Sequence, residues 1–142
     1  MSRAPSYQGG CLCGAVRFAI EGAPTWVATC HCSKCRRAHG AGSVAWVGVE
    51  VGRFTLTKGF EVLTRYQSSE AATRSFCSRC GSPMLFQSTR WPGEMHVALG
   101  LFDAGHGLAP TAHAFFDDRA PWVHVEDGLP RRGGPDGTTP IP

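Results

Sequence analysis

Apolar and polar residues alternate with a period of two in several short segments of this chain. In residues 15–21 the apolar side chains occupy every second position, at Val16, Phe18 and Ile20. Because successive side chains of a strand point to opposite faces, this alternation predicts a half-buried strand. Residues 54–58 and 62–66 alternate in the same way on either side of Gly59. Their spacing predicts that they pair as a hairpin.

Further apolar segments are bounded by glycine, proline or short polar runs, and we expect each of them to be a strand. They comprise residues 25–30, 43–49, 95–99 and 112–116, whereas residues 73–76 and 83–87 lead into and away from the last cysteine pair. Only residues 34–39 carry helix signals, with Ser33 as the expected N-cap and Gly40 as the expected end. The predicted fold class is therefore all-β, with one or two short helices and many short antiparallel strands.

The composition is that of one globular domain. The chain has 142 residues, of which 42% are apolar and 18% charged, and this is enough to bury a core. We expect residues 1–142 to form a single domain whose core spans residues 8–129. Met1 to Ser6 is expected to be a loose leader, and the Pro- and Gly-rich residues 130–142 are expected to be a flexible tail.

The charge pattern gives little support for nucleic-acid binding, because the net charge is only +3 and the basic residues are scattered. No apolar run reaches the length of a membrane span, and residues 1–8 lack the apolar core of a secretion signal. We therefore expect a protein of the cytoplasm, where thiols stay reduced. No residue pattern indicates an oligomeric state.

Seven cysteines lie in three closely spaced groups: Cys11 with Cys13, Cys30 with Cys32 and Cys35, and Cys77 with Cys80. An odd number of cysteines in a reducing compartment argues against a disulfide framework and for metal ligands. In an extended CxC segment both cysteines point the same way, so Cys11 and Cys13 can reach one metal while Leu12 faces the core.

The seven thiols can be divided between metals in two ways. In the first, Cys11, Cys13, Cys77 and Cys80 close one site, and the triplet Cys30, Cys32 and Cys35 forms another. The second pairs Cys32 and Cys35 with Cys77 and Cys80, as a zinc ribbon would, and leaves three thiols without a site. We favour the first, because the triplet can converge on one ion and every thiol is then used.

The two sites of the favoured division predict different roles. A closed four-thiolate zinc is structural and contributes directly to the free energy of folding. A three-thiolate zinc keeps one exchangeable position, as catalytic zinc sites do. Three thiolates leave the ion a weak Lewis acid, which activates water poorly but can hold an incoming thiol as the nucleophilic thiolate. We therefore expect chemistry between a thiol substrate and an electrophile.

An alternative interpretation makes the triplet a second structural zinc site with a protein residue as fourth ligand. His39 is the candidate, because it lies one helical turn after Cys35. Lys34, Arg36 and Arg37 can bind substrate carboxylates or form a solvated helix face. His39 and Arg37 are thus the candidate catalytic residues beyond the cysteines. No metal-ligand spacing connects the remaining histidines, which are His96, His106, His113 and His124.

Three motifs occur in a fixed order: Gly9-Gly10-Cys11-x-Cys13-Gly14, then Cys30-His31-Cys32-x-x-Cys35-Arg36, then Phe76-Cys77-x-x-Cys80-Gly81. With this order the chain resembles the glutathione-dependent formaldehyde-activating (GFA) family over residues 8–129. The resemblance implies a mostly β domain with two zinc ions per chain. It implies that the four paired cysteines hold a structural zinc and that the triplet holds the zinc at which a thiol binds.

The activity implied by the resemblance is that of a carbon–sulfur lyase, which joins formaldehyde to glutathione to give S-hydroxymethylglutathione. The implied partner is a small thiol such as glutathione. The competing hypothesis is a non-enzymatic zinc module, either a thiol carrier or an interaction domain with two structural zincs. Both hypotheses share the metal sites, so thiol binding and turnover have to separate them.

Overall fold

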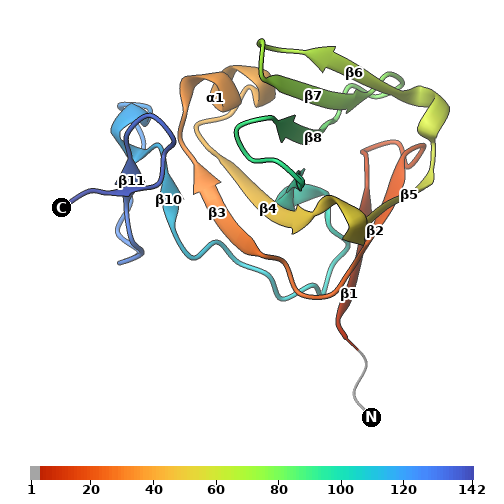
Figure 1. Cartoon of the computed structure of the whole chain (residues 1–142), viewed down its shortest axis with the longest axis horizontal. Helices are drawn as coiled ribbons and strands as arrows, with labels where there is room; N and C mark the ends of the chain where they lie inside the picture. The colour runs from red at the N-terminus through yellow and green to blue at the C-terminus, as the bar shows by residue number, and fades with distance from the viewer. Residues whose placement is uncertain (1–3) are drawn as a thin grey trace. The chain divides into compact units, whose positions relative to one another are not determined.

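The computed structural model describes residues 4–142, and the chain forms two compact units. Unit 1 contains residues 4–25 and 47–107, and unit 2 contains residues 26–46 and 108–142. Both consist of strands joined by short turns, and α1 (Ser33–His39) is the only α-helix among the described residues (Figure 1). The predicted all-β fold class is therefore confirmed. The single domain over residues 1–142 stays a prediction.

Unit 1 begins with a three-stranded antiparallel sheet in the order β1-β2-β5 (Figure 1). Its strands are β1 (Ser6–Gly10), β2 (Arg17–Glu21) and β5 (Phe54–Lys58). The alternation in residues 15–21 buries Val16, Phe18 and Ile20, as predicted. Gly9 lies opposite Phe18, and a side chain at Gly9 would overlap the Phe18 ring. Ser6, the last residue of the predicted leader, starts β1, and residues 1–3 lie outside the described residues.

A second antiparallel group of strands in unit 1 has the order β9-β8-β7-β6. These strands are β6 (Leu63–Gln67), β7 (Ala72–Cys77), β8 (Pro83–Ser88) and β9 (Glu94–Ala98). Strand β4 (Val44–Glu50) has residues in both units. Single 3-10 turns connect several of the strands: η1 (Val51–Arg53), η2 (Phe60–Val62), η3 (Leu99–Leu101) and η4 (Phe116–Asp118).

The predicted hairpin around Gly59 is wrong, although both of its strands exist. Strand β5 pairs with β2, and β6 pairs with β7. Gly59 has a positive φ of 87° and lies against Ala15, where any side chain would overlap the Ala15 carbonyl. The turn η2 follows at once and directs the chain to the other group of strands. Alternation predicts a strand but not its partner, which is decided by long-range packing.

Unit 2 is built on β3 (Trp26–Cys30), which runs directly into the loop before α1 (Figure 1). Strand β10 (His113–Ala114) pairs with β3 in parallel and brings Ala114 opposite Cys30. The buried apolar side chains of this unit include Val27, Phe116 and Ala120. Two histidines, His31 and His113, are buried with them.

Helix α1 ends as predicted but begins with a different cap. Gly40 adopts the left-handed conformation (φ 60°) and ends the helix. The N-cap is Cys32, whose sulfur accepts a hydrogen bond from the Cys35 amide at 3.4 Å. Ser33, the predicted cap, is the first helical residue, and its amide donates to the Asp118 carboxylate at 2.8 Å. A cysteine thus takes the capping position that we predicted for serine, because the loop with Cys32 runs straight into the helix.

Residues 130–142, expected to be a flexible tail, contain a two-stranded sheet of β11 (Arg132–Gly133) and β12 (Thr139–Pro140). The Ile141 amide donates to the Arg131 carbonyl at 2.8 Å, and the Gly134 amide donates to the Asp117 carboxylate at 3.0 Å. The first bond lies within the segment and the second attaches it to η4, and its flexibility stays a prediction. Within residues 4–142, no helix combines the length and apolar character needed to cross a membrane.

Candidate metal centres

The first cysteine cluster lies in unit 1, where the β1–β2 loop meets the turn after β7. Its members are Cys11, Cys13, Cys77 and Cys80, whose sulfurs all lie within 4.8 Å of one another. The sulfur of Cys13 is 3.7 Å from that of Cys11 and 3.8 Å from that of Cys77. A tetrahedral zinc with Zn–S distances of about 2.3 Å places its sulfurs about 3.8 Å apart. The cluster therefore fits a four-thiolate zinc.

Tight turns and hydrogen bonds hold these four cysteines in place. Gly14 and Gly81, which follow the two motifs, have φ angles of 78° and 77° that favour glycine. The Val16 amide donates to the Cys11 sulfur at 3.2 Å. The hydroxyl of Ser82 joins the two loops, because it lies 3.2 Å from the Cys80 sulfur and accepts the Leu12 amide at 3.0 Å.

Leu12 does not face the core, contrary to the prediction. Its side chain is 87% exposed, whereas Cys11 on one side of it is buried and Cys13 on the other is exposed. The alternation argument holds for an extended segment, but residues 11–16 form a turn. The turn brings both sulfurs together by curvature rather than by strand periodicity.

Hydrogen bonds and neighbouring thiols shift the pKa values of the four cysteines in different directions. Hydrogen bonds from the Ser82 side chain and backbone and from the Cys13 backbone lower the pKa of Cys80 to about 5. The backbone bond from Ala15 lowers the pKa of Cys13, but burial and the three neighbouring thiols outweigh it and raise that pKa to about 11. Thiolates this close together cannot all ionise easily unless a cation compensates their charge.

The second cluster lies in unit 2 and consists of Cys30, Cys32 and Cys35, with sulfurs within 4.8 Å of one another. Cys30 ends β3, Cys32 caps α1, and Cys35 lies in the first turn of that helix. Cys30 and Cys35 are buried, and Cys32 is half-buried. Within residues 4–142, no fourth Cys, His, Asp or Glu joins this group. The seven sulfurs are thus grouped in space as in the first division, and their roles as metal ligands stay a prediction.

Two of the three thiols of the triplet have raised pKa values and therefore resist ionisation without a bound cation. Hydrogen-bonding contacts with Cys32 and Cys35, followed by burial, raise the pKa of Cys30 well above its usual range. The contact with Cys30 lowers the pKa of Cys32, but the contact with Cys35 and burial outweigh it, so this pKa is also raised. A bound divalent ion reverses such shifts by stabilising the thiolates.

The candidate residues beyond the cysteines lie apart from the triplet or are bonded elsewhere. The His39 ring packs edge-on against Trp46, with 5.2 Å between the ring centroids, and His39 is not part of the cluster. Arg37 is exposed. Arg36 donates to the carbonyls of His31 at 3.2 Å and Asp118 at 3.1 Å, so it fixes the loop.

A chain of three polar side chains runs beside the triplet and was not predicted from the sequence. His31 Nε2 lies 2.9 Å from His113 Nδ1, and His113 Nε2 lies 2.8 Å from the Asp127 carboxylate. The carboxylate accepts a hydrogen bond from His113 Nε2–H, so His113 Nδ1 accepts a hydrogen bond from His31 Nε2–H. Burial and the neighbouring His113 lower the pKa of His31 to about 4, so His31 is neutral at physiological pH. Because 82 residues separate the two histidines, no local spacing indicated their contact.

Comparison with known proteins agrees with these cysteine clusters. Residues 6–118 match the family model described as "Glutathione-dependent formaldehyde-activating enzyme", and this region contains all seven cysteines. The chain belongs to this family. The resemblance seen in the sequence is thereby confirmed.

Individual proteins are similar to this chain over most of their length. A protein of Halomonas elongata named "Putative glutathione-dependent formaldehyde-activating enzyme" is 32% identical over 84% of this chain and 80% of its own. An uncharacterized lyase of Schizosaccharomyces pombe is 27% identical over 81% of this chain and 82% of its own. A crystal structure of a Rhodobacter sphaeroides protein superimposes with a TM-score of 0.59 at 29% identity, covering 72% of this chain and 91% of that one.

Proposed function

We propose that the protein is a zinc-dependent enzyme of the carbon–sulfur lyase type that joins a small thiol of the glutathione kind to formaldehyde. The observation that carries the proposal is the triplet Cys30, Cys32 and Cys35. Its three sulfurs converge, and no fourth protein ligand joins them in the part of the chain that the structure describes. Membership of the GFA family and the name of the lyase relative support an enzymatic role.

The triplet would hold one zinc, and the four-cysteine cluster would hold a second, structural one. Zinc at the triplet would supply a cation beside which a substrate thiol is favoured as thiolate. The chain keeps the triplet in place through the Cys35 amide, which donates to the Cys32 sulfur, and through Arg36, which donates to the His31 carbonyl. The site needs reduced cysteines, so the proposal applies to a reducing compartment such as the cytoplasm.

The proposed reaction is an addition in which no atom is lost. A bond forms between the thiol sulfur and the carbonyl carbon of formaldehyde, and the second carbon–oxygen bond opens. The thiol proton ends on that oxygen, which gives the S-hydroxymethyl product. With glutathione the product is S-hydroxymethylglutathione, and the reverse direction is the lyase reaction.

The test compares thiol binding with turnover in the zinc-loaded protein. Glutathione is titrated first, and formation of S-hydroxymethylglutathione is then measured against the spontaneous reaction at the same concentrations. Saturable binding together with a rate above the spontaneous one is expected. Binding without acceleration would refute the enzyme and leave a thiol carrier. No binding of any small thiol would instead favour an interaction module.

Replacing one ligand of the triplet ties the activity to this site. We expect Cys35→Ser to lose thiol binding and turnover by more than the roughly 10–100-fold that loss of an outer-shell partner costs at metal sites. The fold should survive, because the proposed structural zinc lies in the other unit. Ser33→Ala, in the same segment, serves as the control with normal binding. Global unfolding of Cys35→Ser in circular dichroism would mark the triplet as structural and contradict its proposed role.

A further inference from the structure

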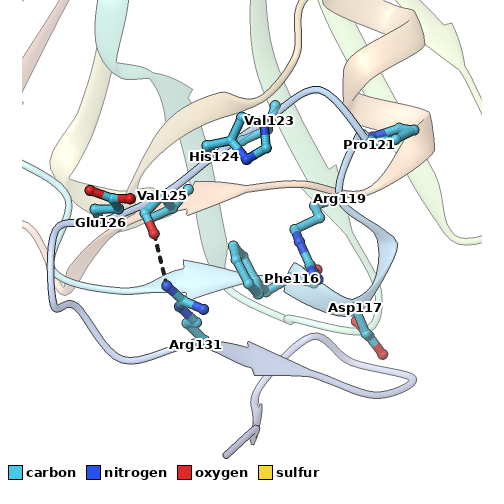
Figure 2. A pocket seen from close by; sticks show the side chains of 9 residues that line it. All are labelled: Phe116, Asp117, Arg119, Pro121, Val123, His124, Val125, Glu126 and Arg131. Carbon is cyan, nitrogen blue, oxygen red and sulfur yellow. Dashed lines mark hydrogen bonds between the residues drawn. The ribbon is translucent and has the colours of Figure 1, made fainter.

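A cavity of about 390 Å³ lies in unit 2, between η4 and the segment that leads to β11 (Figure 2). This volume is within the range of small-molecule sites, which is about 300–1,000 Å³. Its lining includes Phe116, Arg119, Glu126 and Arg131. Arg119 and Arg131 follow the region that matches the family model, which ends at residue 118.

The two arginines stand on either side of the Phe116 ring in Figure 2. Their guanidinium carbons lie 4.4 Å (Arg119) and 4.7 Å (Arg131) from the centroid of that ring. Arg119 also donates to the Phe116 carbonyl at 2.9 Å, and Arg131 donates to the Val125 carbonyl at 2.8 Å. Stacking and one backbone bond each thus hold the two guanidinium groups in place, and most of their five N–H donors remain available.

Their positive charges are not neutralised by the acidic residues of the lining. Within residues 4–142, neither arginine forms an ion pair. Asp117 accepts the Gly134 amide, and Glu126 has no ion pair with either arginine. Two fixed guanidinium groups without acidic partners are complementary to a carboxylate, which arginine binds through paired hydrogen bonds. Glu126, which also belongs to the lining, is complementary to an ammonium group.

Phe116 of the cavity lining also contacts the segment that contains the cysteine triplet. The Phe116 ring contacts the His31 ring edge-on at 5.2 Å, and His31 lies between Cys30 and Cys32 in the chain. Asp118 of the same turn accepts the Ser33 amide of α1 at 2.8 Å. From the His31 ring to the Arg119 guanidinium there are thus two contacts, of 5.2 Å and 4.4 Å.

We propose that Arg119 and Arg131 bind a carboxylate of the thiol substrate while its sulfur lies at the triplet. The inference rests on the proposed function and adds the two residues that would select a thiol with carboxylate groups, such as glutathione. A neutral thiol such as 2-mercaptoethanol would reach the triplet without using the cavity. Arg119 and Arg131 are thus specificity residues that act at a distance from the reacting sulfur.

The experiment measures dissociation constants of the zinc-loaded protein by calorimetry, with three probes. Glutathione tests both sites together, 2-mercaptoethanol tests the triplet alone, and S-methylglutathione, which has no thiol, tests the cavity alone. The variant is Arg119→Gln/Arg131→Gln, and Arg132→Gln is the control, because Arg132 is an exposed neighbour outside the lining. Circular dichroism checks that each variant is folded.

We expect the double variant to bind glutathione and S-methylglutathione about tenfold or more weakly, as loss of charge-assisted hydrogen bonds predicts. Its affinity for 2-mercaptoethanol should be unchanged, and Arg132→Gln should behave as wild type. Equal binding of S-methylglutathione by wild type and double variant would overturn the cavity site. If the double variant is unfolded, the same question is asked with wild type and glutathione diethyl ester, whose carboxylates are blocked. Wild type that binds the ester as tightly as it binds glutathione would also overturn the site. Arginine-dependent binding of S-methylglutathione, with no binding of 2-mercaptoethanol and no turnover of glutathione, would support the cavity and refute the proposed function.

Discussion

The sharpest prediction concerns Cys80, because this residue separates the effect of the metal from the effect of packing. Cys80 is only partly buried, so Cys80→Ser changes little besides the thiolate. Cys77 is fully buried, and its replacement would also disturb the core. If zinc links the two loops of the cluster, Cys80→Ser removes one of its four ligands. We expect this variant to lose the structural zinc and to be strongly destabilised.

The size of the effect follows from the chain length that the cluster closes. Cys13 and Cys77 are 64 residues apart in the sequence. Closing a loop of that length restricts the unfolded chain by about 4 kcal/mol in the chain-entropy model. Domains have net stabilities of about 5–15 kcal/mol, so this link is a large part of the total. For a chain of this size the loss corresponds to a fall in Tm of about 10–20 °C.

The assay combines thermal unfolding by circular dichroism with metal analysis of the folded protein. Wild type should contain two zincs per chain and Cys80→Ser one, with the lower Tm. Ser78→Ala, an exposed residue of the same turn, is the matched control and should keep both the zinc and the Tm. A Cys80→Ser protein that has lost one zinc but melts with wild type would refute the structural role. A wild type with a single zinc would refute the assignment of two sites.

Two further predictions address the buried histidines. Burial lowers the pKa of His96 below its usual value, against the raising effect of Glu94, so only the unfolded state takes up a proton just below pH 6.5. The free energy of unfolding should therefore fall as the pH drops below 6.5. Urea titrations at several pH values should show a smaller fall for His96→Gln than for wild type. Equal falls in the two proteins would contradict this explanation. His113→Gln should lower the free energy of unfolding by about 1–3 kcal/mol, because it disturbs the buried hydrogen bond to His31. Asp127→Asn should lower it by less, because Asp127 is the exposed end of the series from His31 through His113 to Asp127. Equal costs in denaturant titration would contradict this order.

The sequence predicted local structure well because local structure follows from neighbouring residues. Strand β2 appears where Val16, Phe18 and Ile20 alternate, and α1 ends at Gly40 as its position suggested. The pairing of β5 with β2 was missed, because a strand's partner depends on packing between segments far apart in the chain. The prediction that Leu12 faces the core was wrong for a related reason, because residues 11–16 form a turn, in which side chains do not alternate as they do in a strand.

In the candidate site, too, residues that are close in the sequence were predicted, and contacts between distant residues were not. The two cysteine clusters could be anticipated because metal ligands occur at short, recognisable spacings. The chain from His31 through His113 to Asp127 could not, because its members come from three segments with no common spacing. The same holds for Arg119 and Arg131, which come together only because both contact Phe116.

This division suggests where specificity resides in the molecule. In the proposed function, zinc at the triplet would bind the sulfur of any thiol that reaches it, because three identical cysteine ligands do not distinguish one thiol from another. Discrimination between thiols then has to come from groups that contact the rest of the substrate. In unit 2, the cavity beside Phe116 supplies such groups, with two arginines and one glutamate in its lining. A relative with the same seven cysteines but other residues at these three positions should therefore keep its zinc sites and prefer a different thiol.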